Sequence, residues 1–119
     1  MKTIDFLREK NVDIDAALEL LGDEDFYNET LNDFYSSYQE RKQQLETFKN
    51  SSDTENYGIL AHSIKSDCKY LGFMKLADTS YQHELAGKGN DMEFINNNFN
   101  SYMNEYDSII GLVKEYLEG

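Results

Sequence analysis

Proline is absent from the whole chain of 119 residues. Because proline breaks helices and marks many turns, a chain without it can form long uninterrupted helices. Glycine is sparse, and the apolar residues Leu, Ile, Phe, Tyr and Met are spread along the whole length. These features favour an all-α fold, and the length fits a single domain spanning residues 1–119.

Capping residues and apolar periodicity predict five helices after a lead-in at residues 1–12. The predicted helices cover roughly residues 13–21, 23–49, 53–71, 73–88 and 91–117. The last four are amphipathic and joined by short connections. Such helices pack most simply as an antiparallel up-down-up-down four-helix bundle, to which the short helix adds one N-terminal element.

Two local patterns refine this prediction. Ser52, followed three residues later by Glu55, is typical of a capping box at the start of the 53–71 helix. The 73–88 helix is expected to turn Tyr81 and Leu85 inward and to leave His83 in solvent.

The formal net charge of −12 argues against binding to nucleic acid or to anionic membranes, since both depend on basic residues. The single cysteine, Cys68, cannot form an internal disulfide and falls on an apolar stripe, so we interpret it as a core residue. Residues 1–20 contain no signal-like apolar segment. We therefore expect a cytoplasmic protein.

His62 falls on the outer face of the 53–71 helix. At 100° per residue it lies about 160° from the centre of the stripe formed by Tyr57, Leu60, Ile64, Cys68 and Leu71. Gly58, Lys65, Ser66 and Lys69 lie on the same outer face. Residues 58–75 hold three lysines against one aspartate, a formal charge of +2, whereas residues 1–40 carry a formal −8. This pattern makes His62 an accessible histidine in a basic patch, although a surface histidine without function fits it too.

The run from His62 to Gly72, HSIKSDCKYLG, resembles the signature of the histidine-containing phosphotransfer (HPt) domain family. In that signature the histidine is followed by lysine at the third position and by glycine at the tenth, which are Lys65 and Gly72 here. The family usually has glycine at the fourth position, where this chain has Ser66. The order of the predicted helices is also similar to that of an HPt domain over nearly the whole chain.

The resemblance implies that His62 accepts a phosphoryl group on Nε2 and that Lys65 stabilises its charge. It also implies that Glu84, 22 residues after His62, accepts a hydrogen bond from Nδ1 and orients the ring. An ordinary surface carboxylate is the alternative for Glu84. Gly58, Ser66, Lys69 and Gly72 are then candidates for the binding face.

No nucleotide-binding motif is found, so the chain is not expected to be a kinase or to phosphorylate itself from ATP. By the resemblance, its partners are receiver domains of response regulators and a hybrid histidine kinase, and the receiver supplies the Mg²⁺. Two histidines 21 residues apart, without HxxxH or CxxC spacing, also argue against a metal site. We therefore expect no cofactor of its own.

Two other functions remain open at this point. The chain could be a helical interaction module that binds a signalling partner without phosphotransfer. Alternatively, the apolar stripe from Tyr27 to Phe48 could be a coiled-coil dimerisation seam, although it lasts only about three heptads. The bundle interpretation predicts a monomer.

Overall fold

The computed structural model describes the whole chain, residues 1–119, as six α-helices without strands. The all-α class predicted from the sequence is confirmed. The helices are α1 (Ile4–Glu9), α2 (Ile14–Leu21), α3 (Glu24–Asn50), α4 (Thr54–Leu71), α5 (Met74–Lys88) and α6 (Met92–Glu118). The predicted bounds of the last five differ from these by at most one residue at either end.

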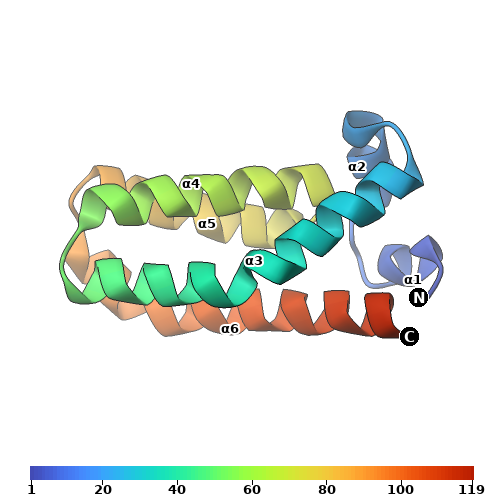
Figure 1. Cartoon of the computed structure of the whole chain (residues 1–119). Coiled ribbons are helices and arrows are strands. Elements are labelled where there is room, and N and C mark those ends of the chain that lie inside the picture. Colours follow the sequence, from blue (N-terminus) through green and yellow to red (C-terminus); the bar gives the residue numbers. More distant parts are fainter.

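The four long helices α3 to α6 pack as a bundle (Figure 1). Each helix contacts the next one along the chain, and α3 also contacts α6, so the set closes on itself. Figure 1 shows the long helices running in alternate directions, with α1, α2 and both termini at one end. The backbone N–H of Lys2 donates to the carbonyl of Tyr116 at 2.9 Å and ties the two terminal segments together.

The prediction of an irregular lead-in at residues 1–12 was wrong, because residues 4–9 form α1. Thr3 is the N-cap of α1, but its side chain makes no capping hydrogen bond. Leu7 is fully buried in the common core. A helix of six residues is too short to be stable alone, so packing of Leu7 explains why it forms.

Aspartates begin most of the other helices. The side chains of Asp13, Asp23, Asp53 and Asp91 each accept a hydrogen bond from the backbone N–H three residues later. The predicted capping box at Ser52 was therefore wrong, since Asp53 is the N-cap of α4. Ser52 lies outside the helix with a positive φ of 55°.

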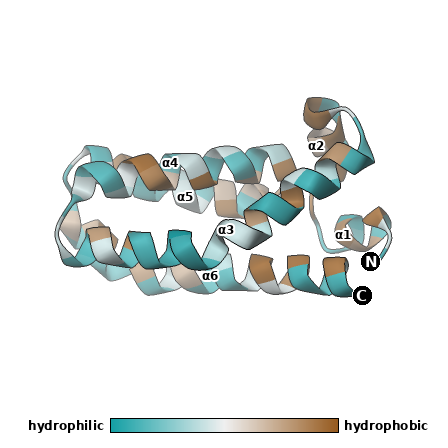
Figure 2. Cartoon of the chain, viewed as in Figure 1, coloured by the Kyte–Doolittle hydropathy of each residue, from teal (hydrophilic) through white to brown (hydrophobic).

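The core is a continuous set of apolar side chains from all six helices. Figure 2 shows hydrophobic and hydrophilic residues alternating along the long helices, as amphipathic packing requires. Tyr27, Leu31, Phe34 and Leu45 of α3 are buried in this core. The stripe that could have formed a coiled-coil seam therefore packs inside the bundle. None of the helices has the length and apolar character needed to cross a membrane.

Candidate functional site

The site is built where α4 and α5 pass very close to each other. A Cβ added to Gly87 of α5 would lie 2.6 Å from the Cα of Gly58 of α4, so no larger residue fits there without a shift. Gly58 is buried in this contact, and its predicted position on the open face was wrong. His62 lies one turn after Gly58 and Glu84 lies one turn before Gly87. Because the two helices run in opposite directions, these residues face each other.

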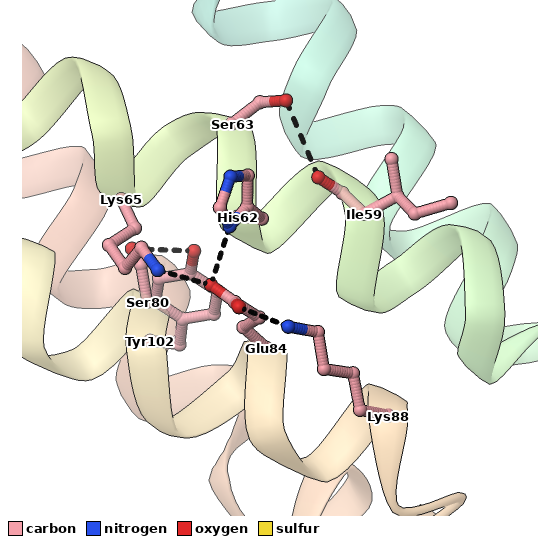
Figure 3. A network of polar contacts seen from close by, with 8 residues as sticks. All are labelled: Ile59, His62, Ser63, Lys65, Ser80, Glu84, Lys88 and Tyr102. Carbon is pink, nitrogen blue, oxygen red and sulfur yellow. Dashed lines mark hydrogen bonds and ion pairs between the residues drawn. The ribbon is translucent and has the colours of Figure 1, made fainter.

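His62 and Glu84 form a hydrogen bond between Nδ1 and Oε1 at 3.0 Å (Figure 3). The His62 side chain is 55% exposed, whereas that of Glu84 is 3% exposed. The predicted contact is thus present, and the alternative of an ordinary surface carboxylate is wrong. A carboxylate only accepts hydrogen bonds, so the bond requires the hydrogen on Nδ1 and leaves a lone pair on Nε2. In Figure 3 the second ring nitrogen points away from Glu84.

Two lysines complete the set of donors around Glu84. Lys65 Nζ lies 2.7 Å from Oε1, the oxygen that also accepts from His62, and Lys88 Nζ lies 2.8 Å from Oε2. Burial by itself would raise the pKa of Glu84. The hydrogen bonds from Lys65, Lys88 and His62 outweigh burial and lower that pKa to about 2. Glu84 is therefore an ionised carboxylate at neutral pH.

Lys65 is held by α5. Its side chain is only 13% exposed, and its ammonium group lies 5.0 Å from the centre of the Tyr81 ring in addition to its contact with Glu84. The contact with Glu84 lies on the Nδ1 side of the imidazole (Figure 3). The lysine three residues after His62 thus contacts the residue that orients the ring.

The other predicted site residues lie farther from His62. Ser66 is partly exposed, and Lys69 is exposed two turns along α4, about 10 Å from His62 along the helix axis. Gly72 ends α4 with a φ of 86°, and an added Cβ would lie 2.5 Å from the carbonyl oxygen of Asp13. Its own carbonyl accepts from the Asp13 N–H at 3.0 Å. Gly72 therefore ends α4 in a buried position and contacts the start of α2. It does not lie on the helix face that carries His62.

A groove of about 610 Å³ adjoins His62 between the ends of α4 and α5. Besides the site residues, one exposed apolar residue, Ile59, lines the groove, together with four polar or acidic residues: Thr54, Glu55, Ser63 and Asn90. Lys88 also lines this groove, and its side chain is 66% exposed. The groove brings the exposed imidazole of His62 and the exposed side chain of Lys88 to the same surface.

Behind the site lies a buried polar layer that the sequence analysis missed. His83 is 1% exposed, and its Nδ1 is 2.7 Å from the hydroxyl of Tyr57. Its ring stacks on Tyr102, whose hydroxyl donates to Ser80 at 2.8 Å. Burial lowers the pKa of His83 to about 4, so the ring is neutral at pH 7. The prediction of a solvated His83 was wrong.

The sequence contained a signal for one missed residue and not for another. Lys88 lies four residues after Glu84 on the same helix, a spacing at which opposite charges pair. Nothing local in the sequence indicates that the missing side chain of Gly87 lets α4 and α5 meet. Cys68 is buried as predicted, and burial raises the pKa of its thiol. No three His, Cys, Asp or Glu side chains cluster in a way that could hold a metal ion.

Comparison with known proteins gave no match to a family model, to a curated protein or to a solved structure. The function must therefore be argued from the site alone.

Proposed function

We propose that this chain is a histidine phosphotransfer protein, in which Nε2 of His62 accepts a phosphoryl group and passes it on. The observation that supports the proposal best is an exposed imidazole whose Nδ1 is bound to a buried, ionised carboxylate. An orienting carboxylate of this kind holds the hydrogen of the neutral ring on Nδ1, so that the lone pair a nucleophile requires lies on Nε2 at the surface. The antiparallel four-helix arrangement of the HPt family is part of the same proposal.

The transfer step can be written with this geometry. The Nε2 lone pair attacks the phosphorus of an aspartyl phosphate and forms the N–P bond. The P–O bond to the aspartate breaks, and its electron pair stays on the departing carboxylate. Nδ1 keeps its hydrogen, so the phosphorylated ring carries a positive charge that faces Glu84 at 3.0 Å. The ionised Glu84 stabilises that charge, and the reverse step returns the neutral ring.

The donors and acceptors in this proposal are receiver domains, with a hybrid histidine kinase as a further source. A receiver presents its aspartate in an acidic pocket together with Mg²⁺, so the chain needs no metal of its own. In a chain of net charge −12, Lys65 and Lys88 balance the charges of Glu84 and Glu55 around His62, and Lys88 presents an exposed ammonium group that complements an acidic pocket. This complementarity would favour docking of the acidic pocket over His62. A monomer in the cytoplasm fits this role.

The decisive experiment is incubation with a phosphorylated receiver domain and Mg²⁺, followed by measurement of the intact mass. We expect a gain of one phosphoryl group that is acid-labile in the wild type and absent in His62→Gln. His62 is exposed, so the variant should fold like the wild type, and circular dichroism checks this.

The alternative is a helical module that binds a signalling partner without chemistry. Binding of receivers without any phosphorylated species, across a broad panel of receivers, would favour that alternative. It would also remove the transfer role from His62.

A further inference from the structure

Two lysines contact Glu84 from opposite sides, and they differ in exposure. We propose that Lys88 is the group that contacts the phosphoryl oxygens, whereas Lys65 is a positioning residue that holds Glu84 and through it the ring of His62. This assignment rests on the proposed function. It moves the stabilisation of phosphoryl charge from the lysine three residues after His62 to a lysine on the neighbouring helix.

The contacts of Lys65 leave its ammonium group little freedom. It shares Oε1 of Glu84 with Nδ1 of His62, at 2.7 Å and 3.0 Å respectively. It also lies over the ring of Tyr81, and the side chain is 13% exposed. If the ammonium group of Lys65 moved towards Nε2, the buried carboxylate of Glu84 would lose a hydrogen-bond donor. This loss would come while phosphorylation gives the His62 ring a positive charge. Lys65 therefore stabilises the site more in its contact with Glu84 than it would near Nε2.

Lys88 has the opposite properties. Its only ion pair is with Oε2 of Glu84, its side chain is 66% exposed, and it lines the groove beside His62. The lysine side of this pair is open to solvent, so the ammonium group can turn from Glu84 to phosphoryl oxygens, at the cost of one donor to the carboxylate. Glu84 would still keep the bonds from Lys65 and His62 after the exchange. One ammonium group is thus free to move with the transferred group.

The charges around the site agree with this division. Lys65 and Lys88 carry two positive charges against the two negative charges of Glu84 and the groove residue Glu55, and Lys88 is the cation among the residues that line the groove. The transferring group spreads negative charge over its outer oxygens. Lys88 can meet those oxygens as the P–O bond of the aspartyl phosphate breaks and the N–P bond to Nε2 forms. No proton or electron is supplied by either lysine.

The test measures single-turnover phosphoryl transfer from a phosphorylated receiver at saturating concentration, so that weaker docking does not affect the rate constant. The variants are Lys88→Met, Lys88→Arg, Lys65→Met and Lys65→Arg. Lys114→Met is the matched control, since Lys114 is an exposed lysine of α6 without an ion pair to Glu84. Nitrogen-15 NMR of the His62 ring in the unphosphorylated protein reports which nitrogen carries the hydrogen.

For Lys88→Met we expect the rate constant to fall at least about 10-fold while the ring keeps its hydrogen on Nδ1. Arginine should restore the rate to within about 3-fold, because it keeps the charge. Lys65→Met should shift part of the population to the other tautomer and slow transfer accordingly, and Lys65→Arg should recover both. The Lys114→Met rate should equal that of the wild type.

A wild-type rate in Lys88→Met would overturn the inference, as would a slow Lys65→Met protein with an unchanged tautomer. In both cases the proposed function would stand, because the wild type is labelled. If the wild type takes no label from any receiver, the proposed function fails and this inference fails with it.

Discussion

Helices α4 and α5 form the two sides of the candidate site, and they follow different rules of burial. On α4 the apolar side chains Ala61, Ile64 and Cys68 are buried and His62 is exposed, as the periodicity of the sequence predicts. On α5 the order is partly reversed, since His83 and Glu84 are buried while Leu85 is 44% exposed. The comparison shows that hydrophobic periodicity predicts which face of a helix is buried only when the neighbouring helices offer no polar partners.

Each buried polar residue of α5 has such a partner on another helix. Glu84 is paired with Lys65 of α4, His83 with Tyr57 of α4, and Ser80 accepts from a tyrosine of α6. A buried polar group without a partner would cost roughly 1–3 kcal/mol, which these bonds avoid. The partners allow α5 to turn a polar face to the bundle and to leave apolar residues outside.

The largest expected effect concerns His83 and pH. The pKa of His83 is about 4 in the folded protein, against an ordinary value of 6.5, so the unfolded chain binds its proton first. The contribution of His83 to the free energy of unfolding is therefore fully present above pH 6.5. It is lost as the pH drops from there towards 4, by about 3 kcal/mol in total. Urea denaturation followed by circular dichroism between pH 7.5 and 4 measures this loss.

Two variants isolate the contribution of His83. His83→Gln keeps a partner for the Tyr57 hydroxyl but does not titrate, so most of the pH dependence in this window should vanish. Tyr57→Phe removes the hydrogen bond and should lower stability by about 1 kcal/mol at pH 7 while keeping the slope. An unchanged slope in His83→Gln would contradict the buried neutral histidine.

The next largest effect is expected at the close contact between the two helices. Gly87→Ala places a methyl group 2.6 Å from the Gly58 Cα and should cost about 2 kcal/mol. Gly111→Ala on α6 is the matched control, since nothing lies within 4 Å of the new Cβ. It should raise stability by about 0.5–1 kcal/mol, because alanine favours a helix over glycine. Equal midpoints of urea denaturation for both variants would refute the role of Gly87.

A smaller loss of stability is expected for Glu84→Gln, together with a loss of function. The amide keeps the shape but removes the charge that faces Lys65, and we expect a loss of about 1 kcal/mol at pH 7. Phosphoryl transfer should slow at least about 10-fold, because Nδ1 loses its ionised acceptor. Glu115→Gln, an exposed site on α6, should change neither quantity. Unchanged transfer in Glu84→Gln would remove Glu84 from the site.

The smallest effect is expected for Leu85→Gln. If α5 buries its polar face, this apolar residue contributes little to the core, and the free energy of unfolding should change by less than about 0.5 kcal/mol. A loss of about 2 kcal/mol in urea denaturation would show that Leu85 packs inside and that the comparison with α4 is wrong.

Much of this architecture could be predicted from the sequence because it depends on local signals. Asp23 and Asp91 cap their helices through bonds to amides three residues away, and Gly72 ends α4 in a left-handed conformation that favours glycine. The contact of His62 with Glu84 was expected from a family resemblance. Spacing alone gave no reason to turn Glu84 inward.

The chain by itself determined the helix bounds, the exposed position of His62 and the acidic background against which its lysines stand out. These properties depend on neighbours within a few residues. The tertiary structure decided that α1 forms, that Gly58 meets Gly87 and that α5 buries a histidine and a glutamate. Each of these depends on atoms far apart in the sequence, because burial of a polar or very small residue is stable only when another helix supplies its partner.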